Sequence, residues 1–266
     1  MSSQAQRGDT FRALHEGEPF VIPNPWDAGS AKVLAALGFK ALATTSSGFA
    51  FTLGRLDGAV SLDEVVEHTR VLAEATDLPL SVDLENGYGP EPQDAATAVV
   101  RAAGAGAVGG SIEDWGAEAG IYELERAAER VAAAVEAARA LEFPFTLTAR
   151  ADNYFRGNPD LDDTIARLQA YERAGADVLY APRLRSTEEI AAVRAGTSKP
   201  LSVLARPDLS MSEMVAAGAQ RVSVGGNLAF VAVGAMAAAA EELRDTGEFA
   251  SLRSQVRLEE WLGDGA

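Results

Sequence analysis

The stretch Ala-Gly-Ala-Asp-Val-Leu-Tyr-Ala at residues 174–181 passes from a helical pattern through a glycine into a short apolar run. Glycine just past a helix end adopts the left-handed conformation that terminates the helix and turns the chain into the next strand. The same join recurs at residues 37–40, 103–106 and 217–220. The chain therefore repeats one unit, in which a helix is followed by a buried strand.

Eight short apolar runs lie along the chain, and a segment in which apolar residues recur at helical spacing follows each of them. The predicted strands are Phe20–Ile22, Ala41–Thr45, Leu80–Leu84, Ala107–Ile112, Phe145–Ala149, Val178–Ala181, Leu201–Leu204 and Arg221–Val224. The clearest helical segments are Asp63–Ala75, Glu123–Ala140 and Asp162–Ala174. Because buried strands that alternate with helices form parallel sheets, eight units in 266 residues favour a (β/α)8 TIM barrel of the α/β class.

A doubly wound open sheet is the alternative architecture. Its Gly-x-Gly-x-x-Gly fingerprint is missing after the first predicted strand, where residues 23–27 read Pro-Asn-Pro-Trp-Asp. No linker or change of composition interrupts the repeated pattern. We therefore expect one domain over residues 1–266, with the barrel at about 18–245 and a helical C-terminal tail at about 246–266.

The composition is that of a globular protein, with 47% hydrophobic and 23% charged residues. A formal net charge of −16 argues against a nucleic-acid partner, because phosphate backbones need clustered lysine and arginine. No apolar run reaches membrane-spanning length, and residues 1–12 lack the apolar core of a signal peptide, so we expect a cytoplasmic protein without membrane contact. The absence of cysteine excludes disulfides, a thiolate nucleophile and cysteine-based metal sites.

Carboxylates gather where the active site of such a barrel lies, at the C-terminal ends of the strands. Asp83 and Glu85 are two residues apart on one predicted strand, so their side chains point to one face, and Glu113 ends the next strand. Three carboxylates in one mouth repel one another unless a cation lies among them. Hard oxygen ligands suit Mg2+, with Mn2+ also possible, although acidic residues at strand ends can also simply cap helices or face water.

Arg150 ends the fifth predicted strand, beside these carboxylates. A guanidinium group binds a carboxylate or phosphate through two parallel hydrogen bonds, so Arg150 is a candidate for substrate binding. The alternative is a structural salt bridge from Arg150 to Asp152 or Glu113. Backbone N–H groups of Ser47 and Gly48 are candidates for stabilising an oxyanion, although a plain turn is equally consistent with this pair.

The lysines and histidines are predicted to lie away from the mouth of the barrel. Lys32 falls in a helical segment, and Lys40 and Lys199 precede strands, so no lysine is placed to form a Schiff base. We expect His15 and His68 to be surface residues rather than catalytic bases. Metal ion, arginine, hydroxyl and carboxylate groups remain, and these suit polarising a 2-oxo acid and stabilising its enolate.

Five motifs occur in a specific order between about residues 11 and 227. They are Asn24–Ala28, Ser46–Gly48, Val82–Gly89, Ser111–Asp114 and Thr148–Asp152. With these motifs the chain resembles the isocitrate lyase / phosphoenolpyruvate mutase superfamily. The resemblance implies a (β/α)8 barrel whose last helix is exchanged between subunits, hence a homodimer or homotetramer. It also implies a Mg2+ ion and a substrate with a pyruvate-like moiety, next to which a C–C or P–C bond is broken or formed.

The resemblance also implies roles for individual residues. Asp83 and Glu85 would hold Mg2+ directly or through water, with Asp57 and Glu113 in support; Glu85 replaces the second aspartate of the family's usual Asp-x-Asp. The candidate catalytic residues are Arg150, Glu113, Asp57 and Tyr88, and the candidate metal ligands are Asp83, Glu85 and Glu113. The candidate substrate-binding residues are Trp26, Ser46, Ser47, Gly48, Arg150, Asn153, Arg183 and Arg206.

The segment after the fourth predicted strand departs from the family pattern. Lyases of the family carry a Lys-Lys-Cys-Gly-His type segment there and mutases a version with lysine, whereas residues 115–122 read Trp-Gly-Ala-Glu-Ala-Gly-Ile-Tyr. This loop offers no lysine, cysteine or histidine. It therefore argues against isocitrate and methylisocitrate cleavage, and against holding a dissociated phosphoryl group.

The sequence favours a Mg2+-dependent carbon–carbon lyase or decarboxylase. Its substrate would be a small 2-oxo or 2-hydroxy dicarboxylate that passes through a metal-stabilised enolate, with Arg183 or Arg206 holding the distal carboxylate. One alternative is a mutase or hydrolase that cleaves the P–C bond of phosphonopyruvate. Others are a phosphate site formed by residues 224–227 and a non-catalytic barrel that binds a 2-oxo acid such as 2-oxoglutarate.

Overall fold

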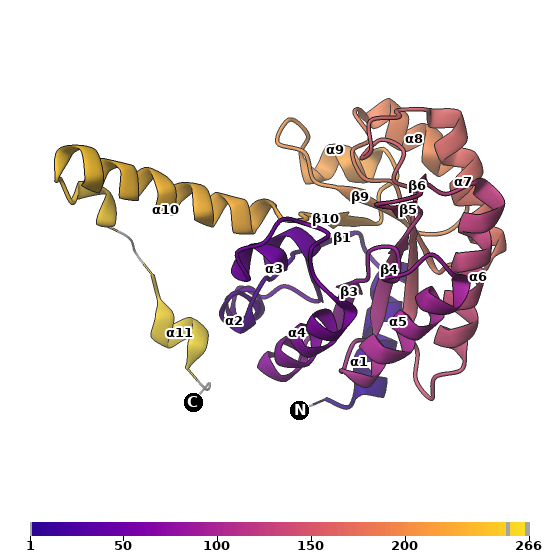
Figure 1. Cartoon of the computed structure of the whole chain (residues 1–266), viewed down its shortest axis with the longest axis horizontal. Helices are drawn as coiled ribbons and strands as arrows, with labels where there is room; N and C mark the ends of the chain where they lie inside the picture. Colours follow the sequence, from indigo (N-terminus) through magenta and orange to yellow (C-terminus); the bar gives the residue numbers. More distant parts are fainter. Residues whose placement is uncertain (1, 254–255, 264–266) are drawn as a thin grey trace.

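The computed structural model of the chain describes residues 2–253 and 256–263 (Figure 1). Eight parallel strands follow one another in the order β1-β10-β9-β8-β7-β4-β3-β2. They are β1 (Phe20–Ile22), β2 (Leu42–Ala43), β3 (Leu80–Asp83), β4 (Gly109–Glu113), β7 (Thr146–Arg150), β8 (Val178–Tyr180), β9 (Leu201–Leu204) and β10 (Arg221–Ser223). A hydrogen bond of 3.1 Å from the N–H of Ala43 to the carbonyl of Pro23 links β2 to the end of β1. The nearly closed barrel confirms the predicted architecture and excludes the doubly wound sheet.

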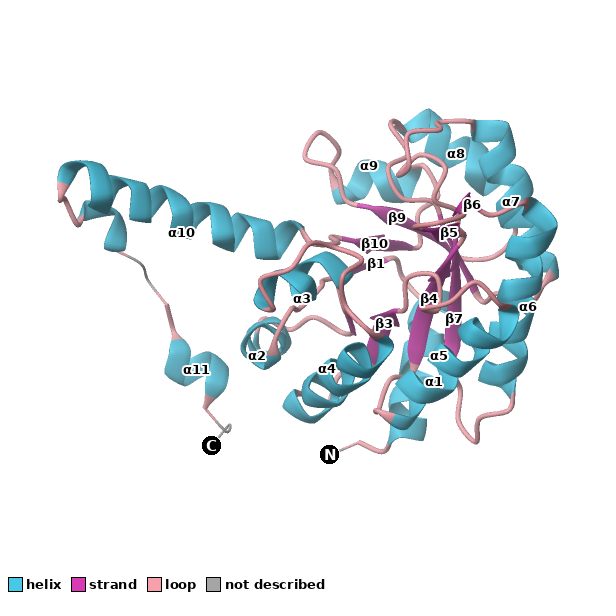
Figure 2. Ribbon diagram, viewed as in Figure 1, coloured by secondary structure: helices cyan, strands magenta, loops and turns pink. Residues whose placement is uncertain are grey.

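Helices surround this barrel, as Figure 2 shows. They are α2 (Ala28–Ala36), α3 (Ser46–Thr52), α4 (Leu62–Ala75), α5 (Pro92–Gly104), α6 (Leu124–Arg139), α7 (Leu161–Arg173), α8 (Thr187–Gly196) and α9 (Met211–Ala216), whereas α10 (Asn227–Thr246) projects away from the barrel. The bounds of α4, α6 and α7 agree with the predicted helical segments to within one residue at each end. Gly106, Gly175 and Gly218 have φ angles of 107°, 99° and 109°, so the predicted left-handed joins are present.

An additional helix, α1 (Gln4–Glu16), packs against the N-terminal half of the chain's first strand. Its few apolar residues do not predict a helix, but Ser3 and Gln6 form a capping box that satisfies the free N–H groups at its start. Phe11 of α1 is fully buried and packs in one apolar cluster with Phe20 and Val108. This contact fixes α1 against the end of the barrel opposite the active-site mouth.

The two histidines are buried, and the prediction that they lie on the surface is wrong. His15 of α1 is 6% exposed and its ring meets the rings of Phe11 and Phe20 edge to face, at 4.8 and 5.3 Å. His68 of α4 is 8% exposed, and its ring stacks on Phe49 at 3.8 Å. Helical periodicity alone did not show that α1 is covered by the barrel.

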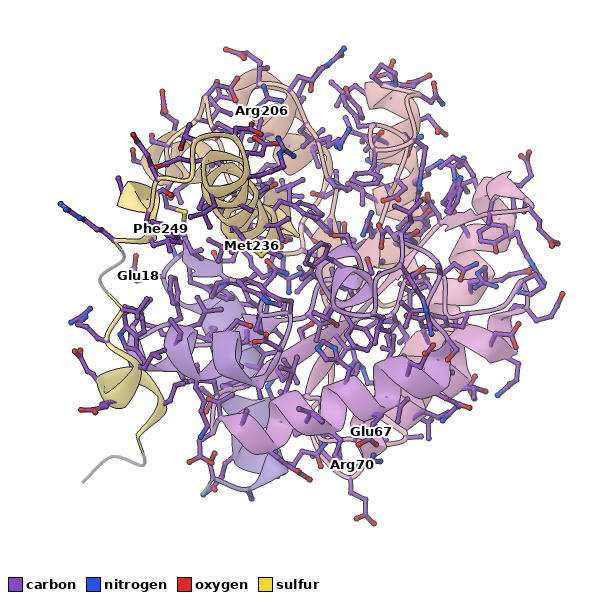
Figure 3. All side chains as sticks on the ribbon, turned by 60° about the vertical axis from the view of Figure 1, so that its left-hand side comes forward. Glu18, Glu67, Arg70, Arg206, Met236 and Phe249 are labelled. Carbon is purple, nitrogen blue, oxygen red and sulfur yellow. The ribbon has the colours of Figure 1, made fainter. Side chains whose placement is uncertain are left out.

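The C-terminal tail leaves the barrel. α10 extends away from the body of the molecule (Figure 1) and carries exposed apolar side chains, including Val231 and Met236 (Figure 3). A 3-10 helix, η1 (Ala250–Leu252), and α11 (Leu258–Leu262) follow, and α11 contacts α2. Residues 254–255 and 264–266 of the predicted tail lie outside the described residues. Exchange of the last helix between subunits stays a prediction. Within the described residues, no helix combines the length and apolarity needed to cross a bilayer.

Burial of His15 predicts a loss of stability in acid. Burial, followed by the positive charge of Arg221, lowers the pKa of His15 from 6.5 to about 3. The unfolded chain thus binds one proton more between these pH values, so stability present above pH 6.5 decreases as the pH falls, by about 1.4 kcal/mol per unit. The free energy of unfolding, measured with urea between pH 6.5 and 5, should fall less steeply with decreasing pH in His15→Gln than in the parent. The difference in this pH dependence should be about 1.4 kcal/mol per pH unit. Equal slopes in the two proteins would refute a neutral buried His15.

Candidate active site

A cavity of about 640 Å³ opens at the C-terminal ends of the barrel strands. This is the size range of sites for small-molecule ligands. The predicted site residues that line it are Ser46, Ser47, Asp57, Asp83, Glu85, Tyr88, Glu113, Arg150 and Arg183. The predicted residues Trp26, Gly48, Asn153 and Arg206 do not line it.

Three carboxylates lie together on the β3 side of the cavity. Asp83 ends β3, Glu85 follows in a left-handed conformation with φ 47°, and Asp57 reaches in from the loop after α3. The N–H of Glu85 donates to Oδ1 of Asp83 at 3.3 Å, and the hydroxyl of Tyr88 donates to Oε1 of Glu85 at 3.4 Å.

Negative charge is not balanced at this group. Burial raises the pKa of Glu85 to about 7, and the charges of Asp83 and Asp57 add to the effect. Burial likewise raises the pKa of Asp57, with a further contribution from Asp83. Carboxylates whose ionisation is disfavoured by burial and by one another's charge form an environment in which a cation is favoured.

The donor set fits Mg2+. In the part of the chain that the structure describes, no three acidic, histidine or cysteine side chains already form a closed metal site. Mg2+ does not need one, because it usually keeps several waters and is bound by one or two carboxylates together with its substrate. Asp83, Glu85 and Asp57 provide such oxygen ligands at the wall of an open cavity.

Glu113 belongs to a different group, an ion-pair network at the ends of β4 and β7. Glu113 and Arg150 are register partners on these strands, and Nη1 of Arg150 lies 3.1 Å from Oε2 of Glu113. Arg150 also pairs with Asp152 through Nε and Nη2, and Arg156 pairs with Glu113 at 3.0 Å and with Asp152 at 3.2 Å. The salt bridges considered for Arg150 are therefore present, and they hold its guanidinium at the cavity wall.

The network keeps Arg150 charged. Burial lowers the pKa of Arg150, but the carboxylates of Glu113 and Asp152 outweigh this effect and raise it well above its usual value. Asp152 is fully buried, and its N–H donates to Oδ1 of Asp114 at 2.8 Å. Asp114 therefore anchors the loop after β7, while Arg150 and Arg156 line the cavity.

Arg156 is a site residue that the sequence interpretation missed. Its guanidinium lies 3.4 Å from the ring centre of Trp115, in a hairpin formed by β5 (Trp115–Gly116) and β6 (Gly120–Ile121). Phe155 lies between Arg150 and Arg183, at 5.1 and 4.5 Å from their guanidinium carbons. Their position in the sequence could have indicated them, because Phe155 and Arg156 follow the end of β7, where an active-site loop begins.

Arg183 and Arg206 differ in their surroundings. Arg183 lines the cavity in a left-handed conformation with φ 64°, and no carboxylate of the described residues forms an ion pair with it. Arg206 pairs with Asp208 at 2.7 Å outside the cavity. Of the two arginines considered for a distal carboxylate, only Arg183 is therefore positioned at the cavity.

Local packing explains why three other predicted residues stand outside the site. The N–H of Gly48 donates to Oγ1 of Thr45 at 3.3 Å as part of the cap of α3, and a Cβ at Gly48 would lie 2.6 Å from Thr45. The side-chain amide of Asn153 donates to Asp163 on α7. Trp26 accepts a hydrogen bond of 3.0 Å from His68 at its carbonyl. These residues stabilise the fold around the site and do not line the cavity.

The fold and this cavity belong to a known family. The sequence model of the family described as phosphoenolpyruvate phosphomutase matches residues 11–244, and the chain belongs to this family. The superfamily suggested by the sequence motifs is thereby confirmed.

Three relatives illustrate the family. A solved structure from Burkholderia cenocepacia J2315, named only by class as a lyase or mutase, is 50% identical, covers 98% of this chain and 96% of its own, and has a TM-score of 0.94. The 2-methylisocitrate lyase of Halalkalibacterium halodurans is 32% identical over 75% of this chain and 67% of its own. The structure of oxaloacetate acetylhydrolase in complex with the product oxalate is 28% identical over 99% and 96%, with a TM-score of 0.87.

The replacement Asp152→Asn should destabilise the protein. It removes a buried negative charge between Arg150 and Arg156, so that Glu113 is their remaining partner in the network. We expect the free energy of unfolding to decrease by about 3 kcal/mol. Guanidinium unfolding measures the loss. Asp9→Asn, which removes an exposed ion pair with Arg12, is the control and should change stability little. Similar effects of the two replacements would show that the network contributes no more than a surface pair.

Proposed function

We propose that the chain is a Mg2+-dependent carbon–carbon lyase or decarboxylase for a small 2-oxo or 2-hydroxy dicarboxylate. One observation carries the proposal: a single cavity holds a group of carboxylates at the end of β3 and, beyond the end of β8, Arg183, which forms no ion pair with a carboxylate in the described part of the chain. Such a cavity accepts a cation and an anionic substrate together. The names of two relatives, 2-methylisocitrate lyase and oxaloacetate acetylhydrolase, support small carboxylates as the substrate class.

Asp83 and Glu85 would hold the Mg2+ ion, or Mn2+ in its place, with Asp57 in support. The ion supplies Lewis acidity, which polarises a 2-oxo group and stabilises the negative charge that develops on its oxygen. Glu85 would lose its proton when the cation binds, because the charges that raise its pKa are then compensated.

The other residues of the cavity orient the substrate and its protons. The hydroxyls of Ser46 and Ser47 and the N–H groups that Arg150 does not use in its ion pairs would bind the 2-oxo carboxylate. Tyr88 keeps its proton, because burial and the negative charge of Glu85 raise its pKa, and this proton points at Oε1 of Glu85. The role of Tyr88 is thus to position Glu85.

The far end of the substrate would lie near Arg183. Its guanidinium rests against the ring of Phe155, which limits the directions in which it can point. Trp115 and Phe155 cover this part of the cavity with apolar surface, which excludes water from the reacting atoms and strengthens electrostatic contacts.

The reaction class is tested by following a mixture of oxaloacetate, dimethylmalate, methylisocitrate, 2-oxoglutarate and phosphonopyruvate by proton and phosphorus NMR. We expect Mg2+-dependent loss of one carboxylate, abolished by EDTA. Asp83→Asn should lower the rate by at least about 100-fold, because it removes charge stabilisation at the developing oxyanion. Asp77→Asn, the same change at an exposed position before β3, should leave the rate unchanged. Turnover of phosphonopyruvate alone would replace the proposal by P–C chemistry, and binding without turnover would indicate a binding protein.

A second experiment tests the preference for dicarboxylates. Arg183→Gln should raise KM for a dicarboxylate by about 10-fold or more, since a charged hydrogen bond to the distal carboxylate is lost, and should leave a monocarboxylate analogue unaffected. Arg206→Gln is the matched control and should affect neither substrate, because Arg206 pairs with Asp208 outside the cavity. Equal losses for both substrate types in Arg183→Gln would reject the assignment.

A further inference from the structure

The barrel interior contains a positive charge that no acidic side chain balances. Arg221, the first residue of β10, is 5% exposed. Its Nε donates to Oγ of Ser202 at 3.0 Å, and its Nη2 donates to Oγ1 of Thr148 at 3.1 Å. Its Nη1 lies 3.2 Å from Nε2 of His15. Among the described residues, no carboxylate lies within ion-pair distance of Arg221.

All three partners of Arg221 are neutral. A guanidinium group only donates hydrogen bonds, so Nε2 of His15 accepts and the proton of this ring lies on Nδ1, which donates to the carbonyl of Phe11 at 2.8 Å. Burial lowers the pKa of Arg221 to about 10, so the guanidinium is still charged at neutral pH. A buried charge without a counter-charge is costly, and buried charges are normally paired.

A second cavity, of about 70 Å³, lies in the barrel interior against Arg221. It shares Thr45, Asp83, Arg150 and Tyr180 with the active-site cavity and therefore lies beneath it. A water molecule needs about 10–15 Å³ of such space, so the cavity has room for a small ion together with a few waters.

Hydrogen-bond donors face this cavity. Arg221 has five N–H groups and uses three of them in the contacts described above. Tyr180 and Ser81 also line the cavity, and within the described residues their hydroxyls take part in no hydrogen bond. Burial raises the pKa of Tyr180 to about 12, so its hydroxyl remains a donor.

We propose that this inner cavity binds a small monovalent anion of the size of chloride, held by the guanidinium of Arg221 and the hydroxyls of Tyr180 and Ser81. Asp83 lines the same cavity as well. The strand register sets Arg221 opposite Ser202 and Ser202 opposite Tyr180, so the guanidinium of Arg221 and the hydroxyl of Tyr180 come from one level of the barrel and the anion lies between them. The competing occupant is water alone, linking Arg221 to Asp83.

Thermal unfolding distinguishes the two occupants. The metal-free protein is prepared in sodium gluconate, whose anion is too large for the cavity, and bromide replaces gluconate at constant ionic strength. We expect a saturable rise in Tm of about 3–5 °C at ten times the Kd for bromide. Arg221→Met should abolish the rise, whereas Arg70→Met, which removes an exposed arginine of α4 (Figure 3), should retain it.

Anomalous diffraction from crystals in bromide locates the ion directly and does not depend on the folding of Arg221→Met. A peak beside Arg221 in the inner cavity supports the proposal, and Ser81→Val, which narrows the cavity, should remove that peak. Bromide found only on the surface, or equal Tm values in bromide and gluconate, overturns the proposal in favour of water. Neither measurement uses substrate or Mg2+, so a failure here leaves the proposed lyase activity untouched.

Discussion

The pairing of Glu113 with Arg150 across β4 and β7 is the contact on which the rest of the active site depends. The two residues are opposite one another in the strand register, so the backbone ladder of the barrel brings the opposite charges together. Asp152 and Arg156 extend the pair into a network that anchors the loop after β7. Each charge is satisfied only when the others are in place, and the loop therefore has one conformation in which its arginines face the cavity.

Two places in the barrel do not have this balance, and they have opposite signs. At the end of β3 three carboxylates lie together and, within the described residues, form no ion pair with an arginine. At the start of β10 the hydrogen-bond partners of Arg221 are neutral groups. The physical rule is the same in both places, because a desolvated charge needs a partner from somewhere. We propose a cation as the partner in the first place and an anion in the second. In the network between these two places, Glu113 and Asp152 supply partners for Arg150 and Arg156 within the chain.

Much of the fold followed from periodicity, because glycine joins and apolar runs are local signals. The positions of Asp83, Glu85 and Glu113 at the cavity followed from the rule that strand ends meet at one mouth, whereas Asp57 was suggested only by the family resemblance. The same rule could not separate Arg183 from Arg206, since both follow strands and they differ in whether they line the cavity or pair with a neighbouring carboxylate. His15 was misplaced for a related reason: its burial depends on α1 packing under the barrel, a contact between segments distant in sequence.

The hairpin after β4 lacks the lysine, cysteine and histidine that related lyases carry in this segment. This absence limits the chemistry that the site can perform. Trp115 of the hairpin instead contacts Arg156, which belongs to the loop after β7. The cation at this place therefore comes from another loop. Glu113 and Asp152 already compensate that cation, which makes it unsuitable for holding a dissociated phosphoryl group. Decarboxylation of a 2-oxo acid releases CO2 and leaves an enolate on the pyruvate-like half, which needs charge stabilisation and then one proton at its carbon. Retro-aldol cleavage of a 2-hydroxy acid needs in addition a base that removes the hydroxyl proton and a donor that protonates the carbanion of the released fragment. A hairpin without lysine, cysteine or histidine is therefore compatible with decarboxylation in which the enolate takes its proton from solvent.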